Sequence, residues 1–138
     1  MLAIILSSLI WQAADGGLSD GTRLPGNCSY PPAVLEIRDG TAFASCNALQ
    51  IDRDGTKGTS LDFRQRSWGS TMRFTGDMAG DEMRVHRVRL RSGVEVAVSG
   101  TCRIEYVRGQ VSVVSCLASA RGRTYAANFV VSRIQTRN

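Results

Sequence analysis

Apolar and polar residues alternate along most of the chain, in short runs separated by turns that contain Gly, Asp or Arg. A period of two is typical of half-buried β-strands, and no stretch shows the period of an amphipathic helix. The pattern predicts about eight strands and no helix. The spacing of the turn signals between these strands is typical of an all-β domain. The residues expected on the inner face are Ala42, Ala44, Leu61, Phe63, Met72, Phe74, Val94, Val96, Val98, Tyr106, Ala118, Tyr125, Ala127, Phe129 and Val131.

The stretch 100–118 predicts a hairpin whose turn is centred on Gly109. In that register Cys102 lies directly opposite Cys116. Because side chains alternate between faces, Tyr106 is expected on the same face as both cysteines. The register therefore favours a disulfide across this hairpin.

The chain contains four cysteines, and four cysteines allow three pairings. If Cys102 pairs with Cys116, Cys28 pairs with Cys46. The alternative is four reduced, buried cysteines in a cytosolic protein. We favour two disulfides, which are typical of exported proteins.

A second hairpin is predicted earlier in the chain, between 33–38 and 41–52, around the turn signal Asp39-Gly40. The order of Gly, Cys, Glu and Arg residues in 26–48 is echoed in 100–118. This echo suggests two similar units, each a hairpin closed by its own pair of cysteines.

The residues before the first hairpin are interpreted as two segments outside the folded domain. The apolar run 2–11, followed by Ala14-Asp15-Gly16, predicts a signal peptide over 1–16, although no Lys or Arg precedes the run. The alternative is a first strand of the mature protein. Residues 17–32 are expected to be an extended, irregular lead-in, because Pro31-Pro32 disfavours both a helix and a central strand.

The remaining residues, 33–138, are long enough for one all-β domain. Sequential antiparallel strands suit an eight-stranded up-and-down barrel or a two-sheet β-sandwich. Closure into a barrel removes the exposed edges of a flat sheet. With the cysteine pattern and the apolar leader, we expect a periplasmic or extracellular protein without a membrane span.

The residues that usually carry catalysis are scarce. The one histidine, His86, lies between Arg84 and Arg87 at a slip in the strand alternation, and the two cations disfavour its protonated form. The cysteine spacings suit disulfides better than a zinc site. No Gly-rich phosphate loop links a strand to a helix. We therefore expect neither an enzyme nor a cofactor or metal.

Charge and exposed aromatics provide the candidate binding residues. The chain has 17 Lys and Arg against 12 Asp and Glu, a net charge of +5. The densest basic run is a candidate anion site, although such runs are often solvated faces. A second basic pair flanks a tryptophan. The candidate anion-binding residues are Arg84, Arg87, Arg89 and Arg91, and the candidate ligand or partner contacts are Trp68, Tyr106, Arg64 and Arg66.

These residues support three hypotheses for an exported, non-enzymatic binding module. The first is a barrel that binds a small apolar ligand or lipid at one mouth, close to Trp68 and Tyr106. The second is a protein-binding module of the cell envelope, such as a hydrolase inhibitor, anchored by Trp68. The third is a domain that binds anionic glycans, lipids or other polyanions through the Arg-rich strand.

Overall fold

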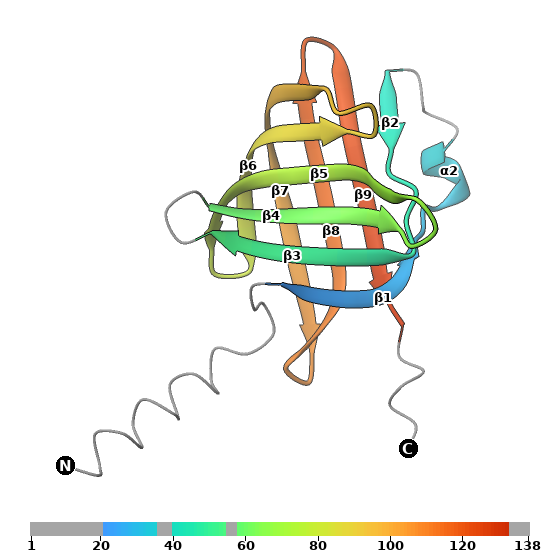
Figure 1. The fold of residues 1–138 in the computed structure, drawn as a ribbon, viewed down its shortest axis with the longest axis vertical. Helices are drawn as coiled ribbons and strands as arrows, with labels where there is room; N and C mark the ends of the chain where they lie inside the picture. Colours follow the sequence, from blue (N-terminus) through green and yellow to red (C-terminus); the bar gives the residue numbers. More distant parts are fainter. Residues whose placement is uncertain (1–20, 36–39, 55–57, 133–138) are drawn as a thin grey trace, which may run out of the picture.

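The computed structural model describes residues 21–35, 40–54 and 58–132, so the expected signal peptide lies outside the described residues. The described chain contains nine strands and one short helix (Figure 1). In chain order they are β1 (Thr22–Cys28), α2 (Pro32–Leu35), β2 (Thr41–Phe43), β3 (Ala48–Asp54), β4 (Gly58–Gln65), β5 (Gly69–Ala79), β6 (Glu82–Leu90), β7 (Glu95–Val107), β8 (Gln110–Ala120) and β9 (Arg123–Val131).

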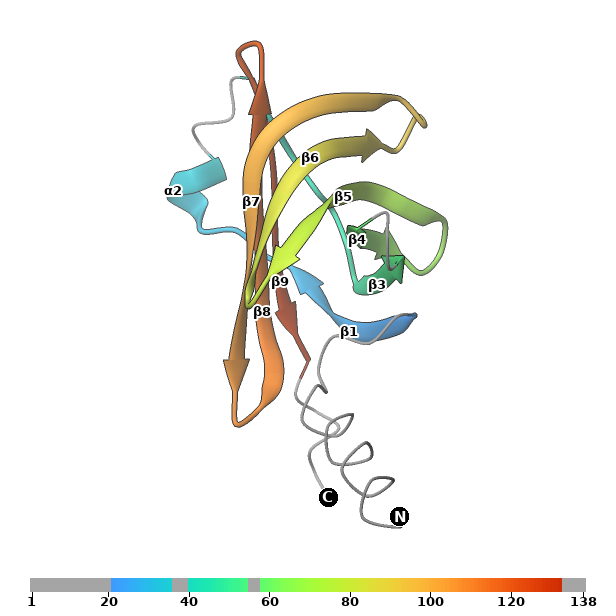
Figure 2. The ribbon, with the colours of Figure 1, turned by 90° about the vertical axis from the view of Figure 1, so that its left-hand side faces the viewer.

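The strands form a closed antiparallel barrel. Each strand from β3 to β8 pairs with the next along the chain, and β1 pairs with both β3 and β9 to close the ring. The remaining strand, β2, lies parallel to β9 outside this ring. In Figure 1, β3, β4 and β5 run across β7, β8 and β9, and Figure 2 shows β6 and β7 curving between the two walls. The barrel prediction is confirmed.

The up-and-down order places alternate connections at opposite ends of the barrel. The β4–β5, β6–β7 and β8–β9 connections lie at one end, which we call the Trp68 end. The β5–β6 and β7–β8 connections lie at the other, which we call the Tyr106 end. Residues at opposite ends cannot form one site.

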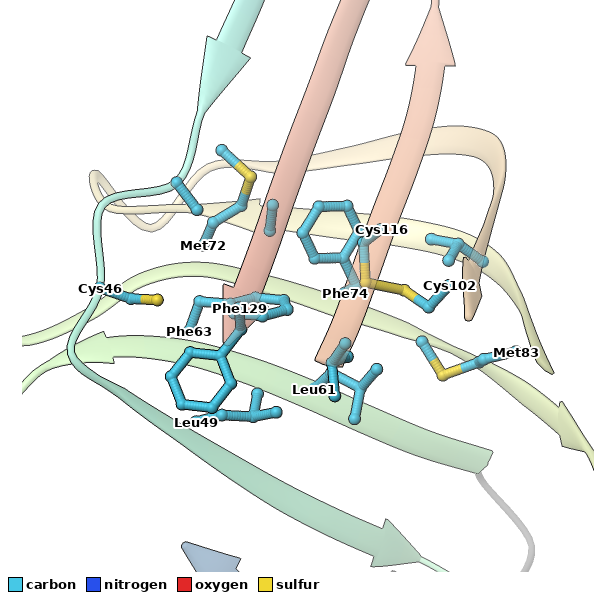
Figure 3. Packing of buried hydrophobic residues seen from close by; sticks show 14 of the residues in the cluster. Cys46, Leu49, Leu61, Phe63, Met72, Phe74, Met83, Cys102, Cys116 and Phe129 are labelled. Carbon is cyan, nitrogen blue, oxygen red and sulfur yellow. A yellow bond between two sulfur atoms is a disulfide. The ribbon is translucent and has the colours of Figure 1, made fainter. Parts of the chain in front are cut away.

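Large side chains occupy the barrel interior. The rings of Phe63, Phe74 and Phe129 are fully buried, and Phe63 lies edge-on to the other two, at centroid distances of 5.7 and 6.4 Å (Figure 3). Such edge-to-face pairs stabilise a core beyond the apolar area they bury. Apart from Val94 and Tyr106, the residues expected on the inner face belong to this core or pack against it.

Both predicted disulfides are confirmed. Cys102 and Cys116 are direct cross-strand partners in the β7–β8 hairpin. Cys28, at the end of β1, is bonded to Cys46, just before β3, and the Cys28 N–H also donates to the Cys46 carbonyl over 2.9 Å. Each bridge therefore joins neighbours in antiparallel segments.

Two residues expected in the core are exposed instead. Tyr106 is 40% exposed near the tip of the β7–β8 hairpin, although its cross-strand partner Val111 belongs to the core. Val94 is exposed because it belongs to the turn that precedes β7. The alternation slip expected at His86 is confirmed as a register shift between β6 and β7.

The first predicted hairpin is wrong. Residues Pro32–Leu35 form a helix, and β2 pairs with β9 rather than with 33–38. Proline is tolerated in the first turn of a helix, where its missing N–H has no intrahelical partner. Only the second of the two proposed units is a cysteine-closed hairpin, because α2 and β2 separate Cys28 from Cys46.

The interpretation of 17–32 as an irregular lead-in is also corrected. Thr22–Cys28 is the barrel strand β1. Pro25 is the last residue of β1 that pairs with β3, and the next residues of the strand pair with β9. The connection that follows is held down by Tyr30, whose hydroxyl donates to the Ala44 carbonyl over 2.6 Å. Burial raises the pKa of Tyr30 to about 12.

Candidate functional site

Two neighbouring loops at the Trp68 end carry an exposed aromatic ring and a cation in contact. The guanidinium carbon of Arg91, in the β6–β7 loop, lies 3.7 Å from the ring centroid of Trp68, in the β4–β5 loop. Both loops project to the right in Figure 1. A guanidinium over an indole face is a favourable cation–π contact. We call Arg66, Trp68, Arg91 and Val94 the Trp68–Arg91 site.

Local turn geometry fixes both loops. The Trp68 N–H donates to the Gln65 carbonyl over 3.1 Å, and Gly69 then takes a φ of 107°, which side-chain-bearing residues rarely adopt. In the β6–β7 loop, the Leu90 N–H donates to the Val94 carbonyl over 2.8 Å. Gly93, with a φ of 95°, supplies the left-handed residue of this loop.

The β4–β5 loop is anchored to the segment before β3. Asn47 Oδ1 accepts a hydrogen bond from the Arg66 N–H over 2.8 Å, and Gln65 Nε2 donates to Ser45 Oγ over 2.9 Å. Cys46, between these two anchors, is bonded to Cys28 on β1. The loop that carries Trp68 is thus connected through side chains and a disulfide to the strand that closes the barrel.

A buried carboxylate braces the base of the same hairpin. Asp62 lies on the outer face of β4, yet its side chain is only 2% exposed. Arg64 Nη1 donates to Asp62 Oδ2 over 2.7 Å, and the Ser70 hydroxyl donates to Asp62 Oδ1. Arg64, expected to touch a ligand or partner, is therefore engaged within the fold. The sequence pattern marks Asp62 only as an outward strand residue.

The exposed part of the site combines apolar and cationic groups. Trp68 is 47% exposed and Val94 is 55% exposed. Arg91 places a positive charge against Trp68, and Arg66, two residues before Trp68, adds a second exposed cation to the same loop. Trp and Arg are enriched among the residues that dominate binding energy in protein interfaces.

The structure does not bring all the predicted binding residues together. Tyr106 lies at the end of the 13-residue strand β7, at the opposite end of the barrel from Trp68. Arg84 also lies toward the Tyr106 end, whereas Arg87 and Arg89 lie on the outer face of β6. The predicted basic run is thus divided among three places, since Arg91 covers Trp68.

An open pocket of about 380 Å³ lies at the Tyr106 end, beside the β5–β6 turn. The fully buried Met83 belongs to its wall. A hydrogen bond and an ion pair lie at this pocket: Asp77 Oδ2 is 2.7 Å from His86 Nε2, and Glu82 is 3.2 Å from Arg103. The lining residues are Asp77, Met78, Ala79, Glu82, Met83, Arg84 and Thr101.

Comparison with protein-family models, with curated proteins and with solved structures finds no match to this chain. The site must therefore be interpreted from its own geometry.

The described residues also bear on chemistry and environment. Within 21–35, 40–54 and 58–132, no three His, Cys, Asp or Glu side chains gather in the manner of metal ligands. The same ranges contain no helix that is long and apolar enough to cross a membrane. The two disulfides are typical of an oxidising environment.

Proposed function

We propose that the protein is an exported, non-enzymatic binding module that holds a protein partner at the Trp68–Arg91 site. One observation carries the proposal: an exposed tryptophan is stacked against an arginine of a second loop. More specifically, we propose a protein-binding module of the cell envelope, such as an inhibitor of a hydrolase.

The anchoring of the β4–β5 loop supports this proposal. Ordering a flexible loop on binding lowers affinity, and a loop already held in place avoids most of that cost. Asn47, Ser45 and the Cys28–Cys46 disulfide hold the loop in this way. Trp68 then offers a large apolar area with few side-chain torsions to immobilise.

The occupied interior favours a surface site over an internal ligand site. The phenylalanine rings at the centre of the barrel occupy space that an enclosed ligand would need. In addition, Trp68 and Tyr106 cannot contact one small ligand from opposite ends of the barrel.

The test compares partner capture by the wild-type chain with capture by Trp68→Ala. The chain is immobilised and exposed to an envelope extract of the producing cells, and captured proteins are identified by mass spectrometry and purified for affinity measurement. Loss of a tryptophan anchor should cost about 2 kcal/mol or more, roughly a thirtyfold weaker Kd.

The matched control is Tyr106→Ala, which removes an exposed aromatic ring at the other end of the barrel. This variant should retain the partner at wild-type affinity. Equal affinity of Trp68→Ala and wild type, or loss of binding only in Tyr106→Ala, would reject the Trp68–Arg91 site.

A small apolar ligand is the second candidate, favoured by the pocket beside the β5–β6 turn. Its volume of about 380 Å³ falls within the range of small-molecule sites. Saturable binding of a hydrophobic dye that disappears in Met78→Lys but persists in Trp68→Ala would support it. Dye binding that is absent in the wild-type chain would reject it.

A further inference from the structure

One wall of the barrel carries no charged side chain along most of its length. Residues 110–120 of β8 and 124–132, which include most of β9, contain no Asp, Glu, Lys or Arg, and the same holds for 96–102 in β7. On the outer face of β6, by contrast, Arg87 and Arg89 are both exposed. An uncharged wall of this extent is unusual in a chain with a net charge of +5, and it calls for an explanation.

Strand alternation determines which residues of this wall face away from the barrel. Cys116 and its cross-strand partner Ala127 belong to the core, so Leu117, the next residue of β8, points outward. In Figure 2, β8 and β9 form a nearly straight wall on one side of the barrel. We call the outward residues of 113–119 and 124–130 the β8–β9 face.

Leu117 stands on this face among small side chains. It is 60% exposed, more than any other large apolar residue of the described chain. Its cross-strand partners are Thr101 on β7 and Ala126 on β9. Ser115 and Ser119 are its outward neighbours along β8. A large side chain surrounded by small ones can interdigitate with a second surface of the same kind.

The polar side chains beside Leu117 are bonded within the chain. The Ser115 hydroxyl donates to Asn128 Oδ1 over 2.6 Å, and Asn128 Nδ2 donates to the Ser29 carbonyl over 2.8 Å. Covering a polar group is costly when its hydrogen bonds to water are lost without replacement. Because these groups already have protein partners, this part of the face can be covered at a low cost in desolvation.

From this arrangement we propose that the β8–β9 face binds the same face of a second copy of this chain, as a two-fold symmetric dimer. In such an interface a patch meets its own copy, so it must be complementary to itself. Leu117 and Val130, which is 42% exposed, would pack against the small side chains of the opposite face. The inference goes beyond the proposed function, because it needs neither Trp68 nor Arg91.

The distribution of charge favours a second copy over an unrelated protein. Two chains with a net charge of +5 repel each other, and a contact through the arginines of β6 would bring like charges together. The β8–β9 face avoids that repulsion. Interfaces between different proteins usually gain specificity and association rate from complementary charges, which this face does not offer.

The area of the wall is enough for a weak dimer. Three strands of about ten residues each, β7 to β9, cover roughly 14 by 34 Å at the usual strand spacing and rise. Two such walls face to face bury about 1,000 Å², the lower limit for a specific protein interface. We therefore expect reversible dimers with a Kd in the micromolar range.

The primary experiment measures the mass of the full chain by sedimentation velocity across the micromolar range, in the absence of any partner of the Trp68–Arg91 site. The wild-type chain should pass from monomer to dimer as its concentration rises. Amide NMR shifts should change with concentration at residues 113–119 and 124–130. Added NaCl should strengthen the dimer, because salt screens the repulsion between two positively charged copies.

Leu117→Glu is the test variant. A carboxylate buried without a partner in the interface should raise the dimer Kd about a hundredfold or more. The substitution also lowers the net positive charge of the chain, so a stronger overall repulsion could not explain the loss. The matched control is Val107→Glu, which makes the same change of charge at an exposed apolar residue of the β7–β8 hairpin tip and should dimerise as wild type does.

A second variant on the neighbouring strand keeps the proposal testable if Leu117→Glu does not fold. Val130→Glu changes an exposed residue of β9 on the same face and should also weaken the dimer. Circular dichroism and the Tm of each variant show whether the barrel is intact.

Each contrary result overturns the proposal. A wild-type chain that stays monomeric at every concentration would reject the dimer. If the face of that monomer were shielded from a soluble paramagnetic agent, another segment of the same chain would cover it. If Leu117→Glu instead lost an envelope partner that the monomer binds, the face would belong to that partner. Equal dimerisation of wild type, Leu117→Glu and Val130→Glu would place the contact between copies elsewhere, and equal loss in Leu117→Glu and Val107→Glu would show a general effect of charge.

Discussion

At the scale of single residues, the strongest departures from a simple strand pattern lie around the β4–β5 hairpin. Asp62 is charged, faces outward and is nevertheless buried. Removing one partner of a buried, hydrogen-bonded charge leaves the other without compensation. Arg64 and Ser70, which flank the Trp68 loop, both depend on this carboxylate.

We therefore expect Asp62→Ala to lower the free energy of unfolding by about 2–3 kcal/mol, the cost of unmatched charged hydrogen bonds. Denaturant unfolding measures the change. Asp81→Ala, in an exposed turn, should change the unfolding free energy by less than about 0.5 kcal/mol. If Asp62→Ala were as stable as Asp81→Ala, the carboxylate would not brace the hairpin.

Tyr30 provides a second residue-scale prediction, on alkaline pH. Its pKa is about 12 in the folded protein, against 10.0 for an unperturbed phenol, because burial disfavours the phenolate. Its contribution to stability is therefore complete below pH 10 and is lost as the pH rises toward 12. A late phenolate absorbance step near pH 12 should be present in the wild-type chain and absent in Tyr30→Phe. An unchanged titration would assign that step to another tyrosine.

Some residue-level features were visible in the sequence and others were not. The alternation identified Phe63 and Phe74 as core residues, because each lies on a regular strand. Tyr106 was misplaced because it lies two residues before the turn at the tip of the hairpin, where the side chain is left 40% exposed, and strand alternation does not indicate where a strand extends beyond the core. The stacking of Arg91 on Trp68 and the pairing of Arg73 with Arg89 depend on neighbours distant in the chain, which alternation alone does not specify.

At the scale of elements, short hairpins were the predictable part of the fold. The cysteine hairpin formed as its register required, with Arg108 and Gly109 at positive φ in a two-residue turn. The segment between Cys28 and Cys46 could not be derived in the same way, because β2 pairs in parallel with β9. Parallel pairing joins distant segments and leaves no local turn signal.

The two disulfides should differ in what they control. In the Trp11→Phe background, Trp68 is the sole tryptophan. Replacing Cys28 and Cys46 by Ser should increase the mobility of Trp68, measured by time-resolved fluorescence anisotropy, because Cys46 lies between the loop's two anchors.

Replacing Cys102 and Cys116 by Ser should instead lower the free energy of unfolding by about 3 kcal/mol, the chain-entropy value for a loop of this size, and leave the mobility of Trp68 unchanged. Equal anisotropy changes in the two double variants would show that the Cys28–Cys46 bridge does not specifically hold the loop.

At the scale of the whole molecule, the barrel depends on one strand that changes partners along its length. Residues 22–25 of β1 pair with β3, and residues 26–28 pair with β9. At the change of partner, a Cβ on Gly26 would lie 2.2 Å from the Val130 carbonyl oxygen and 2.6 Å from the Phe129 ring. Only glycine permits this closure.

Gly26→Ala should therefore separate β1 from β9 and lower the free energy of unfolding by about 1–3 kcal/mol, the usual cost of overpacking. Hydrogen exchange should accelerate at Gly26–Cys28 and at their partners on β9. Asn27→Ala, at an exposed neighbour, should leave exchange at this seam unchanged. Unchanged hydrogen exchange at Gly26–Cys28 and at their partners on β9 in Gly26→Ala would show that the two backbones can move apart enough to admit the methyl group.

The disulfide between Cys28 on β1 and Cys46 makes the rigidity of the Trp68 loop depend on the redox state of its surroundings. In a thiol-reducing compartment the ring can close through its hydrogen bonds, but the segment beneath the Trp68 loop lacks its covalent tether. Oxidation would then fix the shape of the Trp68 loop as well as stabilise the fold. Under the proposed function, a partner that requires the rigid loop would bind the chain only in an oxidising compartment.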